Sequence, residues 1–150
     1  MAAVTYPNDK VISFINEKMV PLQVSFDAQP IATDFNVKWT PTIITLDSKG
    51  KEHHRTVGFL APEELIPSLL LGIAKGYFDG DQFDNALATL NKLLLEYPES
   101  DSTSEAIYLR GVCLYKNTHK AEPLKEAYEK LNARDPKGEW TKRAYPYRLL

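Results

Sequence analysis

The first sixty residues mix short segments of helical period with short segments of strand period. After Asn8, a favourable N-cap residue, apolar side chains recur at helical spacing and predict a short helix over residues 9–17. From Val20 to Phe26 every second residue is apolar, which predicts a strand. Residues 30–35 are compatible with one more short helix.

A β-hairpin is predicted over residues 41–59. Residues 41–46 are dominated by β-branched side chains, and residues 52–59 form another strand-like segment. The turn between them, residues 47–50, ends in a glycine, where a positive φ is useful. Together with the strand at 20–26, the first half of the chain therefore has three predicted strands.

Residues 61–150 have helical periodicity almost throughout. Pro62 opens the first helix, and Gly80, Pro98 and Pro136 mark the ends of later ones. The predicted helices cover residues 63–77, 84–96, 104–116 and 124–133, and a last short helix begins near residue 139 and stops by residue 146.

The helical half repeats itself. Tyr77 and Tyr115 are 38 residues apart, Pro98 and Pro136 have the same separation, and each unit has the order helix, polar break, helix, proline. This arrangement resembles the tetratricopeptide repeat, whose period is about 34 residues, with the roughly four extra residues in the linker 99–102. The alternative is a helical subdomain unrelated to that family. The resemblance implies a protein or peptide partner. The tyrosines of this half are expected mainly to pack within the helical pairs, and the alternative is that some of them line a concave face that binds peptide, with Tyr77, Tyr108 and Tyr115 as the candidates.

The first half carries a second resemblance. Thr40-Pro41-Thr42 leads into the β-branched strand, and the hairpin ends in Val57-Gly58-Phe59. The segment 37–44 resembles the cis-proline loop of the thioredoxin-like family, and residues 6–22 are similar to one branch of that family. The resemblance implies that Trp39, Thr40, Pro41 and Thr42 form a loop that contacts a bound peptide. The alternative is that Pro41 is structural and Trp39 only fills space.

The two resemblances together give the expected fold class and its division. Residues 1–75 are expected to form a truncated α/β thioredoxin-like domain with three recognisable strands. Residues 76–150 are expected to form an all-α tetratricopeptide-like region. Helix 63–77 would be shared at the junction, since no Gly/Ser-rich or Pro-rich linker separates the halves.

Cys113, the one cysteine, separates the chain from catalytic members of the thioredoxin-like family. Dithiol–disulfide exchange needs a second thiol to resolve the mixed disulfide, and the family's Cys-x-x-Cys and the strand before it have no counterpart here. Either that segment lies upstream of Met1 in a longer oxidoreductase, or the chain is a degenerate member. Losing a central strand would leave unpaired edges at Met19–Phe26 and Pro41–Leu46. We expect these edges to pair with each other or to be covered by a second copy, giving a homo-oligomer.

Composition narrows the remaining classes. The net charge is −2, acids and bases are interspersed, and no basic face typical of a nucleic-acid-binding protein is apparent. No apolar segment is long enough to span a bilayer or to act as a signal peptide, so the expected compartment is the cytoplasm. His53 and His54 are adjacent on a strand and are expected on opposite faces, so no metal site is predicted. Cys113 is expected to be a buried structural thiol.

These observations favour a thioredoxin-like and tetratricopeptide-like protein that has no catalytic residue and no cofactor in this form and that binds another protein. One alternative is a fragment of a thiol–disulfide oxidoreductase. Another is a structural or assembly module in which the α/β half only caps the helices.

Overall fold

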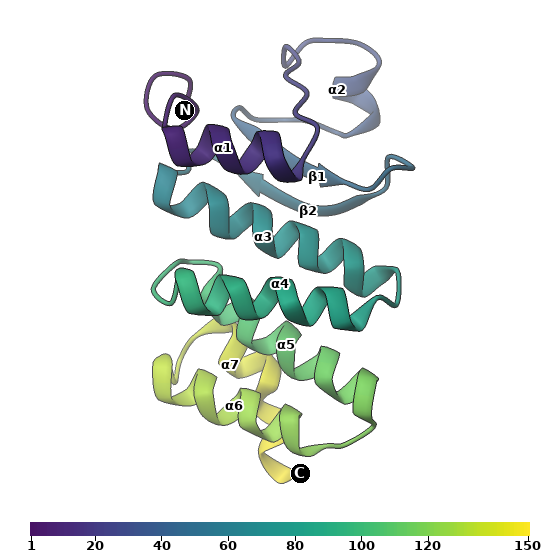
Figure 1. Ribbon diagram of the computed structural model, residues 1–150, viewed down its shortest axis with the longest axis vertical. Helices are drawn as coiled ribbons and strands as arrows, with labels where there is room; N and C mark the ends of the chain where they lie inside the picture. The colour runs from purple at the N-terminus through teal and green to yellow at the C-terminus, as the bar shows by residue number, and fades with distance from the viewer.

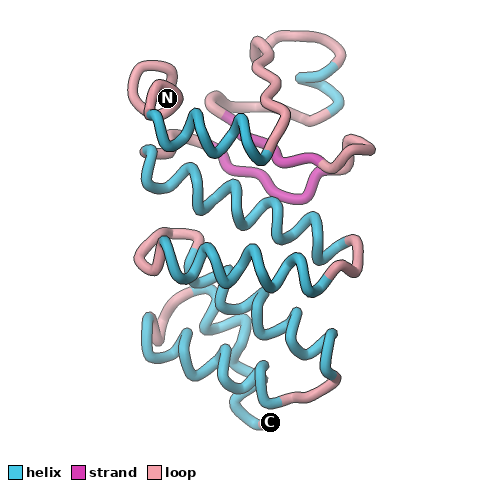
Figure 2. Tube along the Cα trace, viewed as in Figure 1, coloured by secondary structure: helices cyan, strands magenta, loops and turns pink.

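The computed structural model describes residues 1–150 as a stack of helices with a small sheet near the N-terminal end (Figure 1, Figure 2). Every predicted helix is present, with ends within two residues of the expected ones. None of the helices combines the length and the apolar character that a bilayer crossing requires. The elements are α1 (Asp9–Lys18), α2 (Ile31–Asp34), β1 (Thr42–Leu46), β2 (Glu52–Val57), α3 (Pro62–Asp79), α4 (Phe83–Glu96), α5 (Thr103–Thr118), α6 (Glu122–Arg134), α7 (Glu139–Ala144) and the 3-10 helix η1 (Tyr145–Leu149).

Helix α3 lies at the centre of the stack and is covered on several sides. Every residue from Leu65 to Gly72 is buried. The helix packs against α4 on one side and against α1 and the sheet on the other. A helix that is apolar around most of its circumference is stable only in such a core position. Pro62 at its first turn and the acidic side chains of Glu63 and Glu64 favour its start there.

Strands β1 and β2 form the predicted antiparallel hairpin, which is the whole sheet. One face of the hairpin rests on α3, and the approach is close at Thr45: a Cβ atom built on Gly72 would lie 2.5 Å from the Thr45 hydroxyl oxygen. On the other face Arg55 donates a hydrogen bond of 2.7 Å to the carbonyl of Phe35, which holds the end of α2 against the sheet. The sheet is therefore a middle layer between α3 and the α2 segment.

The strand predicted at residues 20–26 does not form, so the expectation of three strands is wrong. Val20 is 96% exposed, and Leu22, Val24 and Phe26 are exposed as well. No backbone N–H group from residue 20 to residue 27 donates a backbone hydrogen bond. The alternating pattern records a segment suited to a sheet, but a strand exists only where a neighbour pairs with it. With two strands, the structure does not confirm a thioredoxin-like half.

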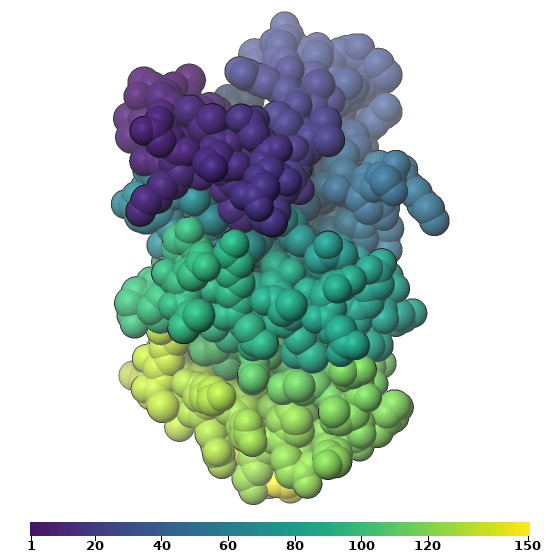
Figure 3. Space-filling view, viewed as in Figure 1, coloured from purple at the N-terminus to yellow at the C-terminus, as the bar shows by residue number.

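The helical region consists of two hairpins, α3 with α4 and α5 with α6, followed by α7 and η1. Gly111 allows α5 and α6 to approach closely, because a Cβ atom there would lie 2.7 Å from Cβ of Ala127 and 3.0 Å from the carbonyl oxygen of Pro123. Arg134 at the end of α6 donates to the carbonyl of Pro98 at 2.8 Å and so connects the second hairpin to the end of the first. On the face shown in Figure 3 the helical layers and the N-terminal half meet without a break.

Candidate functional site

The loop before β1 presents Trp39 on the surface while its backbone is fixed. Trp39 is 68% exposed. Its carbonyl accepts a hydrogen bond of 2.6 Å from the Thr42 hydroxyl, and the carbonyl of Pro41 accepts one of 2.8 Å from the N–H of Gly58. The Thr40–Pro41 peptide bond is cis. A large aromatic side chain is thus carried by a loop whose backbone is hydrogen-bonded at Trp39 and at Pro41.

Apolar side chains of β2 extend the surface around this loop. Val57 is opposite Thr42 in the hairpin register, and Gly58 is bonded to Pro41, so Val57 and Phe59 lie beside the loop. Both side chains are more than half exposed. We define the Trp39 surface as Trp39, Thr40, Pro41, Thr42, Val57 and Phe59.

The three tyrosines predicted on a helical face have different environments. Tyr77 of α3 packs against the hydrophobic core. Tyr108 of α5 stacks on Tyr147 at 5.9 Å between ring centroids, and the C-terminal segment therefore covers it. Tyr115 is 38% exposed. The ring of Tyr77 makes no aromatic contact with the ring of Tyr108 or of Tyr115.

A groove with a volume of about 280 Å³ lies between α4 and α6, with α5 as its floor. Leu95 at its edge is 82% exposed. Arg110 on the floor donates to the Asn91 side chain at 2.7 Å, which fixes its guanidinium. The groove therefore combines apolar surface with charge of both signs, since Glu126 and Lys130 also line it.

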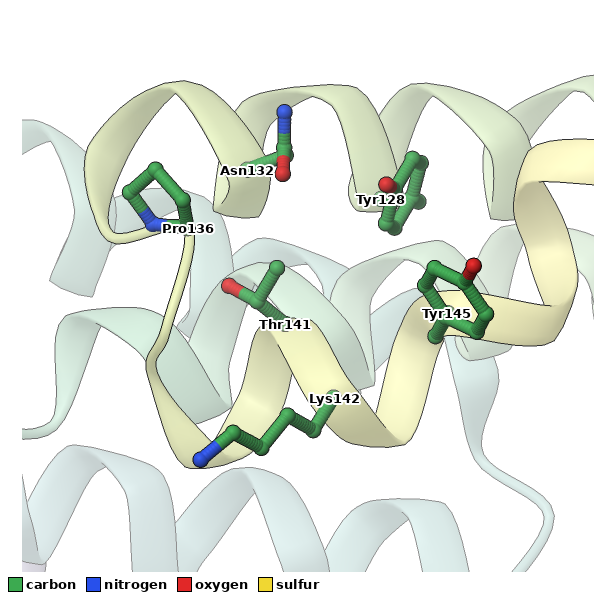
Figure 4. Close-up of a pocket in the computed structure, with 6 residues that line it drawn as sticks. All are labelled: Tyr128, Asn132, Pro136, Thr141, Lys142 and Tyr145. Atoms are coloured by element: carbon green, nitrogen blue, oxygen red, sulfur yellow. The ribbon is translucent and has the colours of Figure 1, made fainter.

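A second pocket, of about 230 Å³, lies between α6 and α7 (Figure 4). Tyr128 and Tyr145 pack edge to face, with ring centroids 6.2 Å apart. The Thr141 hydroxyl is already used, because it donates to the carbonyl of Asp135 at 2.7 Å. Figure 4 shows the ammonium of Lys142 directed away from the two rings. This pocket could admit a single small side chain but offers no convergent set of charged groups.

A polar network joins the sheet to the helices without forming a nucleophile. His54 Nε2 lies 3.2 Å from the Ser68 hydroxyl, and the Lys75 ammonium lies 3.2 Å from His54 Nδ1. Burial, together with the charge of Lys75, lowers the pKa of His54 to about 4, so the ring is neutral at pH 7. A neutral imidazole has one N–H group. Because Lys75 donates to Nδ1, that proton is on Nε2 and points at Ser68, so His54 cannot accept the Ser68 proton.

His53 is held between two carboxylates. Its Nδ1 lies 2.6 Å from Asp79 and its Nε2 lies 3.1 Å from Asp47, with the side chain only 4% exposed. Both ring nitrogens face acceptors, which suits the doubly protonated imidazolium. Burial lowers the pKa of His53, but the hydrogen bonds to Asp47 and Asp79 outweigh burial and raise it above its ordinary value. The bond from His53, followed by backbone N–H groups, lowers the pKa of Asp47 to about 2.

Both histidines contact α3, so the expectation that they lie on opposite faces is wrong. The register pairs Thr45 with His54 and Leu46 with Glu52, which leaves His53 as an extra residue in a bulge of β2. The bulge redirects His53 toward the last residue of α3, while His54 reaches the middle of the same helix. Their ring nitrogens face separate partners and do not converge on one point.

Cys113 is fully buried in the packed face of α5, as predicted. Burial raises its pKa to about 11. Because the thiolate is the reactive form, this thiol is a poor nucleophile at neutral pH. Cys113 therefore belongs to the core and not to a site.

Residues 68–100 match the family model of the tetratricopeptide repeat. The match covers α3 from Ser68 onward, all of α4 and the turn after it, which is the first of the two helical hairpins. It confirms a tetratricopeptide-like region, and repeats of this kind typically serve as protein-interaction modules. It gives no support to a thioredoxin-like family. No curated protein and no solved structure matches the chain.

The sequence did not point to two features that shape these surfaces. The groove between α4 and α6 depends on Leu95, whose position in the apolar run Leu93 to Leu95 predicts burial as readily as exposure. The carboxylate clamp on His53 depends on a one-residue bulge. The run of polar residues in β2 gave a weak signal for a bulge or an exposed edge, and it carried no information about the partner on α3.

Proposed function

We propose that this chain is a non-catalytic protein-interaction module that holds a peptide segment of its partner at the Trp39 surface. The helical hairpins would act as the rigid support, and residues 1–75 would carry the contact. The observation that carries the proposal is the exposure of Trp39 on a loop whose backbone carbonyls are already bonded. The match of residues 68–100 to an interaction repeat supports the same class of function.

The entropy cost of binding is low at an aromatic contact that is already ordered. Tryptophan is enriched at interface positions where truncation to alanine costs the most binding energy. Its two side-chain torsions are few for so large a contact area, and the bonds at Trp39 and Pro41 already restrict the loop. A preordered contact loses less conformational freedom when a partner binds. Val57 and Phe59 beside it provide further apolar area.

The absence of catalysis in this proposal rests on the chemistry of the candidate groups. Cys113 has no second thiol and a raised pKa. The Ser68 hydroxyl oxygen accepts a hydrogen bond from His54 Nε2–H, so His54 cannot take the Ser68 proton. Describing residues 1–75 as a shortened thioredoxin-like domain remains a hypothesis that rests on the sequence resemblance at residues 37–44.

The test is selection of binding peptides from a phage-displayed library against the whole chain, followed by titration with each selected peptide. Trp140 is replaced by phenylalanine so that Trp39 alone reports binding through its fluorescence. We expect a blue shift on binding and, for Trp39→Ala measured by calorimetry, a loss of affinity of about thirtyfold or more.

Leu95→Ala is the matched control, because Leu95 is another exposed apolar residue, on α4. This change should leave the affinity within about twofold of the parent, since Leu95 lies on α4 and outside the Trp39 surface. Peptides that lose affinity with Leu95→Ala and keep it with Trp39→Ala would place the site in the groove between α4 and α6 and refute the proposal.

A further inference from the structure

The two outer edges of the hairpin differ in how they are protected. β2 carries Glu52, Arg55 and two histidines, and its bulge interrupts the regular spacing of backbone groups. Charged side chains and bulges are the usual means by which edge strands avoid pairing with other chains. β1 has the sequence Thr-Ile-Ile-Thr-Leu, with no charge, no proline and no inserted residue. Its edge therefore lacks each of these protections.

The outward backbone groups of β1 are free. The N–H of Gly58 bonds to the carbonyl of Pro41, and the N–H of Asp47 bonds to that of Lys51, so odd-numbered residues of this segment face β2. By the alternation of an antiparallel ladder, the N–H and C=O groups of residues 42, 44 and 46 point the other way. None of these groups takes part in a backbone hydrogen bond with another segment.

We propose that two copies of the chain pair through β1, antiparallel and about a two-fold axis at Ile44, so that the two hairpins form one continuous sheet. Ile44 would face Ile44 of the second copy, and Thr42 would face its Leu46. About six backbone hydrogen bonds would then close the outward groups of both strands. Such an isologous contact is the commonest arrangement in homodimers.

The charge and the composition of the surface favour a second copy of the chain as the partner of the β1 edge. An uncharged, β-branched strand pairs well with another of the same kind, and no like charges come opposite each other. In Figure 1 the segment between α1 and α2 lies beyond β1, on the side away from β2. That segment carries the four exposed apolar side chains of residues 20–26, so the same end of the molecule presents further apolar surface that a second copy could bury.

The first test is the molar mass of the purified chain by sedimentation equilibrium from low to high micromolar concentration. We expect a concentration-dependent rise to twice the monomer mass. Ile44→Pro removes an outward N–H without removing a bond to β2, and it should raise the dimer dissociation constant about tenfold or more. Val57→Pro is the matched control, because it removes an outward N–H from the opposite edge of the same sheet, and it should leave dimerisation unchanged.

Hydrogen exchange distinguishes this interface from any other. The amides of Thr42, Ile44 and Leu46 should exchange more slowly as the protein concentration rises. Leu46→Lys, which changes an exposed side chain of the same edge, should also weaken pairing. It replaces Ile44→Pro in the test if circular dichroism shows that Ile44→Pro is misfolded. A monomer at every concentration overturns the proposal, even if a strand from another protein binds there. It is equally overturned by a dimer whose β1 amides exchange at an unchanged rate, or by one that Val57→Pro weakens as much as Ile44→Pro.

Discussion

Replacing Gly72 with alanine tests whether the hairpin packs directly on α3. The new Cβ would lie 2.5 Å from the hydroxyl oxygen of Thr45, 2.9 Å from its Cβ and 3.1 Å from its methyl carbon. Overpacking of this kind costs about 1–3 kcal/mol, while alanine gains about 1 kcal/mol over glycine inside a helix. The difference leaves a net loss of up to about 2 kcal/mol for Gly72→Ala, which lowers the melting temperature by up to roughly 8 °C for a chain of this length.

Gly76, one turn later on α3, provides the control for this prediction. A Cβ at Gly76 would meet only the His53 ring, at 3.7 Å, which is ordinary contact. Gly76→Ala should therefore stabilise the chain by about 0.5–1 kcal/mol through the same helix propensity. Thermal unfolding by circular dichroism measures both variants, and Thr45→Ala should restore part of the loss in Gly72→Ala. The packing of the hairpin on α3 is refuted if Gly72→Ala raises the melting temperature as much as Gly76→Ala does, or if Thr45→Ala lowers it further in the Gly72→Ala background.

Two further predictions concern titration and reactivity. The pKa of His54 falls to about 4 in the folded chain, so its contribution to stability is complete above pH 6.5 and is lost as the pH falls toward 4. The loss is on the order of 2 kcal/mol after allowing for the partial exposure of the ring. In urea unfolding measured as a function of pH, His54→Gln should remove this fall in the free energy of unfolding toward low pH. His53 acts in the opposite sense, since its raised pKa gives stability below pH 6.5 that is lost as the pH rises through the folded value, and His53→Gln should remove that alkaline slope. The intact chain should not reduce insulin disulfides above a no-protein control, and Cys113 should react with a thiol reagent only on unfolding, so rapid labelling of the native chain would contradict its burial.

The helices could be predicted closely because their signals are local. Asn8 caps α1 with hydrogen bonds to the N–H groups of Lys10 and Val11, and Pro62 and Pro123 lie in the first turns of α3 and α6. The repeat spacing of Tyr77 and Tyr115 likewise depends only on the order of residues along the chain. The hydrophobic period, the capping residues and the helix-breaking residues all lie within a few helical turns of the helix ends that they determine.

The features that could not be predicted depend on contacts between distant residues. The alternation from Val20 to Phe26 identifies a segment suited to a sheet, but it carries no information on whether a neighbouring strand is available. The bulge at His53 changes which face a side chain occupies, and one extra residue is enough to do so. In the candidate site, Trp39 and Pro41 could be identified from the sequence, whereas the adjacent Phe59 and the close approach of Thr45 to Gly72 follow from the folded hairpin.

The burial of α3 on opposite sides has a consequence for how the chain can be divided. Removing residues 1–60 would expose the side of α3 on which Ser68 bonds to Thr56 and Gly72 meets Thr45, and removing the later helices would expose the side against α4. Neither half should therefore fold independently if it is transferred to another protein. The chain should therefore unfold in a single transition with one heat-absorption peak.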